Sequence, residues 1–188
     1  FFSIHLILFQ KERTMAVVGL FYGSDTGNTE NIAKMIQKQL GNELVDIRDI
    51  AKSSKEDIEG YDFLLFGIPT WYYGEAQADW DDFFPTLEEI DFTDKLVGIF
   101  GCGDQEDYAD YFCDAIGTVR DIVEPRGAII VGNWSTDGYT FEASKAVLDD
   151  GNFIGLCIDE DRQPELTAER VEKWTKQIYD EMCLAELA

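Results

Sequence analysis

The sequence predicts an α/β protein, a doubly wound five-stranded parallel sheet of order 2-1-3-4-5 with helices on both faces. Short apolar runs alternate along the chain with longer segments whose apolar residues recur at helical spacing. Polar or glycine-containing segments follow the first, third and fourth strands, where such a sheet binds its ligands. The 188 residues, 45% of them hydrophobic, are enough for one domain with a sizeable core.

The five predicted strands are the apolar runs of the chain. The fifth is expected in two pieces, separated by a polar, glycine-containing insert over residues 132–152 to which we assign no chemistry. In order, the predicted strands are 16–22, 43–47, 62–68, 95–101 and the pair 128–131 and 153–158.

Helices are expected between the strands, wherever apolar residues line one helical face. Ser53 or Ser54 is a suitable N-cap for a brief helix that ends near Gly60, and Pro125 ends a later one. One predicted helix follows the first strand and carries Ile32, Met35, Ile36 and Leu40 on one face. The other predicted helices span 78–87, 111–124 and 167–187.

A hydroxyl-rich loop joins the first strand to the first helix. Unpaired backbone N–H groups and the helix dipole favour an anion at this place. A Walker loop requires Lys after its last glycine, whereas Asn28 follows Gly27, so nucleoside triphosphate chemistry is disfavoured. We expect a phosphate held by neutral donors, and an ordinary polar loop is the alternative. The loop consists of Ser24, Asp25, Thr26, Gly27, Asn28 and Thr29.

Three consecutive aromatic residues follow the third strand. A soluble surface rarely carries three such residues without a use, and a planar ligand that stacks on their faces explains them. The alternative is that these side chains pack into the core, which is plausible for one of the three residues but hardly for all three. The segment reads Pro69, Thr70, Trp71, Tyr72, Tyr73 and Gly74.

The loop after the fourth strand starts with Gly101, Cys102 and Gly103, which let the backbone approach a ligand closely. Asp104 follows as a candidate hydrogen-bond acceptor, with a turn-forming role as the alternative.

These motifs together resemble the flavodoxin family. Ser-x-Thr-Gly-x-Thr over 24–29 resembles its phosphate loop, and the segments 69–74, 101–105 and 159–163 continue the resemblance in the same order. The resemblance extends from Met15 to the C-terminus and is greatest to the long-chain bacterial flavodoxins. It implies a flavodoxin-like fold, a non-covalently bound FMN and low-potential one-electron transfer.

The resemblance also implies a role for individual residues. Trp71 is expected on one face of the flavin ring and Tyr108 on the other, with Tyr111 as the neighbour that is easily mistaken for Tyr108. Asp104 is expected to accept from the ring N3–H. Thr70 and Asp161 are expected at the ribityl hydroxyls, Asp161 on the family analogy alone.

The formal charge of −23 makes nucleic acid and anionic membranes poor partners and a basic protein surface a good one. Four cysteines without a Cys-x-x-Cys pair indicate reduced thiols and a cytoplasmic protein. His5 is the single histidine, which excludes Ser-His-Asp and Cys-His catalysis and disfavours transition-metal sites. We therefore expect neither catalytic residues nor a metal.

Residues 1–14 do not match the family. Their apolar stretch is too short to span a bilayer, and its basic residues follow it rather than precede it as in a signal peptide. We interpret 1–14 as a translated upstream extension and 15–188 as a single FMN-binding domain. A membrane anchor is the less favoured alternative.

The leading functional hypothesis is a monomeric electron carrier between an NADPH-dependent reductase and basic acceptor proteins. The alternative is a flavodoxin-like NAD(P)H or quinone oxidoreductase, against which stands the lack of a second glycine-rich dinucleotide loop. A phosphorylated receiver domain shares the strand order but would have no use for Trp71 and Tyr108.

Overall fold

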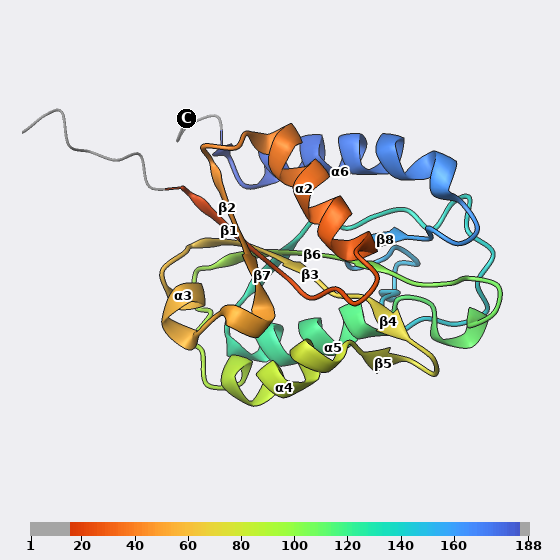
Figure 1. The fold of residues 1–188 in the computed structure, drawn as a ribbon, viewed down its shortest axis with the longest axis horizontal. Helices are drawn as coiled ribbons and strands as arrows, with labels where there is room; N and C mark the ends of the chain where they lie inside the picture. Colours follow the sequence, from red (N-terminus) through yellow and green to blue (C-terminus); the bar gives the residue numbers. More distant parts are fainter. Residues whose placement is uncertain (1–15, 185–188) are drawn as a thin grey trace, which may run out of the picture.

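The structure, a computed structural model, describes residues 16–184, and the predicted extension 1–14 lies outside them. Its main sheet is parallel, with the order β2-β1-β3-β6-β7 and with β8 also paired to β6 (Figure 1). The predicted fold class and strand order are therefore confirmed. The strands of this sheet are β1 (Val18–Tyr22), β2 (Val45–Asp49), β3 (Phe63–Gly67), β6 (Leu96–Cys102), β7 (Ile129–Val131) and β8 (Leu156–Ile158).

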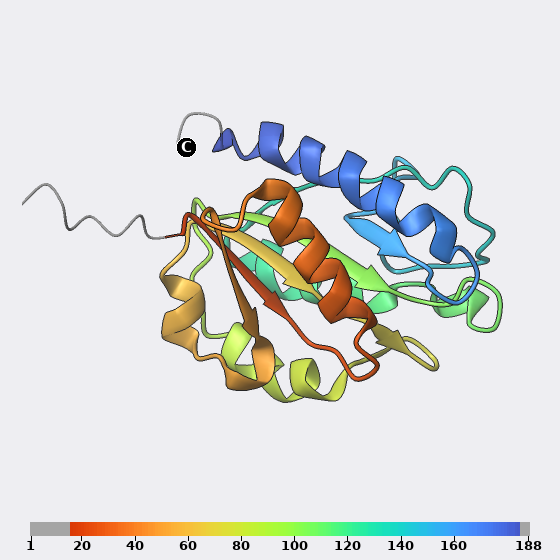
Figure 2. The same ribbon diagram turned by 45° about the horizontal axis from the view of Figure 1, so that its top comes forward.

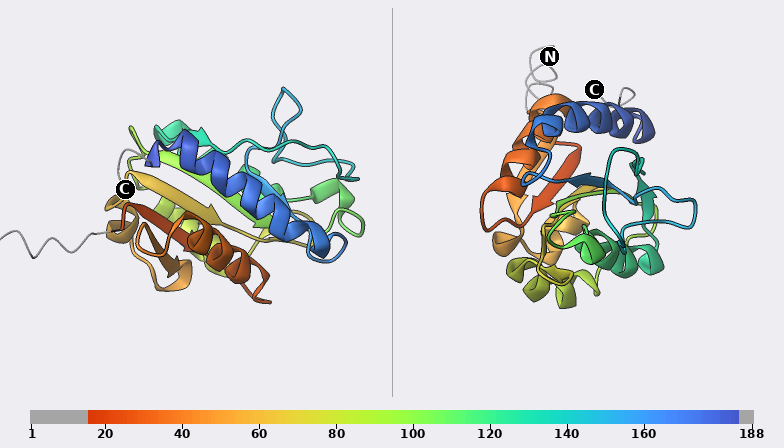
Figure 3. Two further views of the ribbon diagram at one scale, coloured as in Figure 1. Left: turned by 90° about the horizontal axis from the view of Figure 1, so that it is seen from above. Right: turned by 90° about the vertical axis from the view of Figure 1, so that its right-hand side faces the viewer.

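Helices cover both faces of the sheet because its central strands are apolar on both sides. Figure 1 and the view from above in Figure 3 show α2 and α6 on one face, with α3, α4 and α5 on the other. No helix within residues 16–184 is long and apolar enough to cross a membrane. The helices are α2 (Asn28–Leu40), α3 (Lys55–Glu59), α4 (Ala78–Leu87), α5 (Asp114–Val123) and α6 (Thr167–Glu181), with short 3₁₀ turns at Ile50–Lys52, Ala109–Tyr111, Glu124–Arg126 and Pro164–Leu166.

The fifth strand position is occupied in two pieces, as predicted. β7 pairs with the first half of β6 and β8 with the second half, so the insert leaves the sheet and returns to the same edge. Gly155 lies just before β8, where a Cβ would stand 1.9 Å from the carbonyl oxygen of Ile99. The chain returns to the sheet by a close backbone approach that only glycine permits.

Several local predictions were wrong. β2 begins two residues later than the predicted 43–47, and α6 ends at Glu181, before the predicted end of the last helix. Two other differences lie near the cavity. The helix predicted over 111–124 begins at Asp114, because Cys113 adopts a left-handed conformation (φ 56°) that separates it from the preceding 3₁₀ turn. The aromatic segment, predicted as a loop, contains a small antiparallel hairpin made of β4 (Thr70–Trp71) and β5 (Glu75–Ala76). Its turn uses positive φ at Tyr72 and Gly74. We call residues 70–76 the aromatic hairpin.

The approach at Gly155 generates a prediction about stability. Gly155→Ala should lower the free energy of unfolding by about 1–3 kcal/mol, because the added methyl group overlaps the Ile99 carbonyl and the strands must separate. Gly60→Ala is the matched control, since its Cβ would meet the nearest atoms at 3.5 and 3.6 Å. Urea denaturation of both variants measures the difference, and equal stability of the two would contradict the prediction.

Candidate functional site

A cavity of about 230 Å³ opens where the carboxyl ends of β1, β3, β6 and β8 meet. Figure 2 shows the aromatic hairpin and the loop after β6 projecting from this end of the sheet, which faces the viewer in the right panel of Figure 3. The cavity is lined by Ser24, Asp25, Thr26, Asn28, Thr29, Pro69, Thr70, Trp71, Tyr72, Cys102, Gly103, Asp104, Tyr108, Glu160 and Asp161.

The loop at one end of the cavity presents backbone donors. Gly27 is the N-cap of α2, with φ 90° and no side-chain cap, so the first amides of the helix lack partners within it. The Ser24 hydroxyl accepts from Gly27 N at 3.1 Å, which holds the loop in its turn. Free amides and the helix dipole make this end of the cavity suited to an anion. Its described wall contains no Lys or Arg.

A buried glutamine ties this loop to the aromatic hairpin. Gln77 caps α4 and is 1% exposed, and its Nε2 donates to Asp25 Oδ1 at 3.0 Å. A Cβ on Gly23 would stand 2.2 Å from Gln77 Oε1, so a side chain at residue 23 would displace the Gln77 amide from this position. The sequence motifs do not reveal this link.

The aromatic hairpin has one half-buried and two exposed aromatic residues. Trp71 lines the cavity, whereas Tyr72 and Tyr73 are 56% and 72% exposed. Trp71 Nε1 is buried and has no hydrogen-bond partner within the described part of the chain. Tyr72 keeps its positive φ although a left-handed conformation is unfavourable for a bulky residue. Strain of this kind is typical of a binding site.

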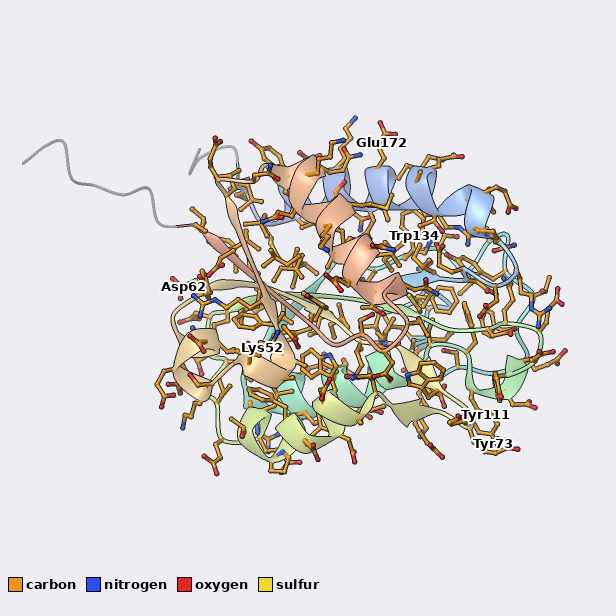
Figure 4. All side chains as sticks on the ribbon, viewed as in Figure 1. Lys52, Asp62, Tyr73, Tyr111, Trp134 and Glu172 are labelled. Carbon is orange, nitrogen blue, oxygen red and sulfur yellow. The ribbon has the colours of Figure 1, made fainter. Side chains whose placement is uncertain are left out.

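Tyr108 lies in the cavity wall next to the aromatic hairpin. Its ring centroid lies 6.3 Å from that of Tyr72 and 6.3 Å from that of Tyr73. Tyr111 lies 5.7 Å from Tyr73, and Figure 4 shows these two side chains together at the same end of the molecule. Tyr108 lines the cavity and Tyr111 does not. The choice of Tyr108 over Tyr111 agrees with this geometry.

Asp104 lines the cavity, but its carboxylate already accepts several hydrogen bonds. Its Oδ1 accepts from the backbone of Glu106 and Asp107, and both oxygens accept from the Arg162 guanidinium at 3.1 and 3.0 Å. The pKa of Asp104 is lowered because these bonds outweigh the effect of its burial. Its two backbone contacts are those of a turn-forming residue, the alternative that the sequence left open, and its contacts with Arg162 join the loop to the segment after β8.

Two other ionisable groups beside the site are protonated more readily than usual because they are buried. Burial raises the pKa of the Cys102 thiol, which accepts from the Thr29 hydroxyl at 3.6 Å. Burial also raises the pKa of Asp114, whose Oδ1 accepts from Lys145 N at 2.8 Å beneath the aromatic hairpin.

Most of the predicted cofactor-binding residues line the cavity. Gly27, Tyr73 and Gly74 do not, since the first turns the loop and the other two form the tip of the aromatic hairpin. Glu160 lines the cavity but was not predicted. Its place within the segment 159–163, which carries the resemblance, was the available signal.

Comparison with known proteins places the chain in a family. The family model described as flavodoxin matches residues 20–174. The chain is 91% identical over 174 residues to a flavodoxin of Haemophilus influenzae, covering 93% of this chain and 100% of that one. It is 76% identical to flavodoxin 1 of Escherichia coli over 173 residues, or 92% of this chain and 98% of the other.

A solved structure agrees with this assignment. The crystal structure of Fusobacterium nucleatum flavodoxin bound to flavin mononucleotide superposes with a TM-score of 0.82 at 38% identity, covering 87% of this chain and 97% of that one. A mutant of the same protein, also bound to flavin mononucleotide, gives a TM-score of 0.83 at 39% identity, with 89% and 97% covered. The chain belongs to the flavodoxin family, whose members are FMN-binding electron-transfer proteins rather than enzymes.

Proposed function

We propose that the cavity binds FMN with its phosphate in the loop 24–29 and its ring between Trp71 and Tyr108, and that the protein carries single electrons. The observation that carries the proposal is the pairing of an uncapped helix N-terminus at one end of the cavity with aromatic walls at the other. The buried, unpartnered Trp71 Nε1 also fits a ligand with acceptor atoms in this cavity.

FMN supplies the redox chemistry when bound, and the protein supplies its environment. Backbone amides at the start of α2 and the hydroxyls of Ser24 and Thr26 bind the phosphate without a basic side chain. Trp71 and Tyr108 exclude water from the ring faces. Glu160 and Asp161 place negative charge in the wall, which disfavours added negative charge in the cavity and keeps the reduction potential low.

We further propose that the electron partners, an NADPH-dependent reductase and acceptor enzymes, bind a monomer of this chain through basic surfaces. A second, open hollow lies beside Trp71 and has Asp25, Glu75 and Asp81 in its wall. Asp82 lies next to it on α4. Asp107 already pairs with Arg162 at 2.7 Å and Asp79 accepts from Gln77, so Glu75, Asp81 and Asp82 are the carboxylates most available to a partner.

A phosphate in the loop 24–29 predicts different effects on two ligands. Thr26→Val should weaken FMN binding by about 1.5–3 kcal/mol, because it removes a donor to a charged group. Riboflavin lacks the phosphate, so its affinity should be nearly unchanged. Fluorescence titration of the cofactor-free protein measures both, with Thr86→Val on α4 as the control variant. Equal losses for the two ligands would place the phosphate elsewhere.

A ring between the two aromatic walls predicts a loss on truncation. Trp71→Ala and Tyr108→Ala should each weaken FMN and riboflavin alike by about 1–3 kcal/mol, by analogy with base–aromatic stacking. Tyr111→Ala is the matched control, because Tyr111 contacts Tyr73 but does not line the cavity. If the control lost as much affinity as Tyr108→Ala, the ring would not be stacked on Tyr108.

Electrostatic attraction to a basic reductase predicts salt-dependent electron transfer. The second-order rate should fall steeply with ionic strength, since opposite charges mainly speed encounter. The triple variant Glu75→Gln, Asp81→Asn, Asp82→Asn should slow the rate at low salt and flatten its salt dependence, with FMN affinity little changed. Stopped-flow measurement over a salt series tests this.

The control for this prediction removes the same charge elsewhere. Glu43→Gln, Asp62→Asn and Glu172→Gln change net charge equally, and Figure 4 shows Asp62 and Glu172 on other parts of the surface than the tyrosines at the cavity end. This variant should keep most of the salt dependence. Equal slowing by both triple variants would mean that net charge, not the surface beside Trp71, attracts the partner.

A further inference from the structure

The insert, residues 132–152, lies alongside the loop that carries Tyr108. We call residues 103–113 the Tyr108 loop. Residues 140–145 of the insert form a series of hydrogen bonds with this loop and with the first residue of α5. The Thr140 amide donates to Gln105 Oε1 at 2.6 Å. The Glu142 and Ala143 amides both donate to the Ala109 carbonyl, at 2.9 and 3.0 Å. The Ser144 hydroxyl then donates to the Phe112 carbonyl, and the Lys145 amide donates to Asp114 Oδ1.

Aromatic packing joins the same two segments from the inside. The ring of Phe112 lies 5.7 Å from those of Tyr139 and Phe141 in the insert, and 5.9 Å from that of Phe153 just beyond it. The Tyr139 hydroxyl donates to the Cys157 carbonyl at 2.6 Å, which attaches this packed group to β8. The insert therefore lies packed between the sheet and the Tyr108 loop.

A buried polar pair connects both segments to a third. Gln105 is 1% exposed and Asp159 is fully buried. Asp159 Oδ2 accepts from Gln105 N at 3.0 Å and from Gln105 Nε2 at 2.9 Å, while Gln105 Oε1 accepts from the insert at Thr140. The Gln105 side chain thus donates to Asp159 through its Nε2 and accepts from the insert through its Oε1.

The other carboxylate oxygen of Asp159 orders the turn that follows β8. Asp159 Oδ1 accepts from the amides of Asp161 and Arg162 at 3.1 and 2.9 Å. This turn brings Glu160 and Asp161 to the cavity wall, and Arg162 reaches back to Asp104 in the Tyr108 loop. The pair Gln105–Asp159 is consequently shared by the insert, the Tyr108 loop and the acidic wall.

We propose that the insert orders the Tyr108 loop for flavin binding, and that Gln105 and Asp159 are the positioning residues that couple the two. The inference rests on the proposed placement of the ring against Tyr108. Ordering loop backbone opposes binding because it lowers the conformational entropy of the chain, so a loop that is already ordered binds more tightly. Neither positioning residue lines the cavity, and both act through the loops they hold.

Gln105→Met tests the coupling, because methionine keeps the length of the side chain but not its hydrogen bonds. Amides of 103–113 and of 132–152 should exchange faster together in the cofactor-free protein. Affinity for FMN and for riboflavin should fall equally, by roughly tenfold, since the ring rather than the phosphate loses its support. Gln37→Met is the matched control, as Gln37 bonds the Val45 carbonyl on β2, and it should change neither readout.

Restoration of the buried pair provides a second readout that general destabilisation would not produce. Gln105→Glu sets two buried carboxylates against each other and should weaken FMN at least as much as Gln105→Met. Adding Asp159→Asn to that variant restores the hydrogen bond between the two side chains but leaves the amide of residue 105 without its acceptor, so affinity should recover in part towards that of the parent protein. If Gln105→Met does not fold, Thr140→Pro removes the amide donor to Gln105, with Thr140→Ala as its control.

The outcomes separate this proposal from the one on which it rests. Faster exchange in only one of the two segments, unchanged FMN affinity, or no recovery in the double variant overturns the coupling. If Tyr108→Ala weakens FMN but Gln105→Met does not, the coupling is wrong and the ring placement stands. If neither substitution weakens FMN, the ring placement is wrong as well.

Discussion

Hydrogen bonding along both edges of β6 is the constraint on which the rest of the structure depends. One edge pairs with β3 and the other with β7 and then β8, so β6 holds three separate segments in register. Glycine makes this closeness possible: a Cβ on Gly101 would stand 2.2 Å from the Ile68 carbonyl oxygen, and one on Gly155 would stand 1.9 Å from that of Ile99. Because all these strands are parallel, the loops that form the cavity emerge at one end of the sheet.

Polar side chains then fix how those loops lie relative to one another. Gln77 connects the loop 24–29 to the aromatic hairpin, and Gln105 connects the Tyr108 loop to Asp159. Gln77, Gln105 and Asp159 are all buried, and the polar atoms of their side chains form hydrogen bonds with neighbouring segments. A buried polar group without partners is costly, so such contacts favour one arrangement of the loops over others. The cavity is built by these links as much as by the residues that face it.

The distribution of charge suits a carrier of electrons better than a catalyst. The end of the cavity at the loop 24–29 contains backbone amides, hydroxyls and Asp25, whose carboxylate accepts from Gln77, and the other end contains aromatic and acidic side chains. Burial raises the pKa of the Cys102 thiol, and both carboxylate oxygens of Asp104 accept from Arg162. Outside the cavity, Glu75, Asp81 and Asp82 place exposed negative charge on and beside the aromatic hairpin.

The alternation of apolar runs and helical faces was enough to predict a parallel α/β sheet and a fifth strand in two pieces, because these follow from short-range patterns. The motifs at the strand ends, together with the family resemblance, predicted the strand order and most of the cavity wall. The start of α5, the aromatic hairpin and the environment of Asp104 were not predictable, since each depends on a backbone conformation or an ion pair with a distant segment. The same is true of the insert, whose polar residues carry no sign of its packing against Phe112. Gln105 bonds residues 35 and 54 positions away. Contacts at such separations leave no periodic signal in the chain, so only the tertiary structure decided which polar residues hold the site together.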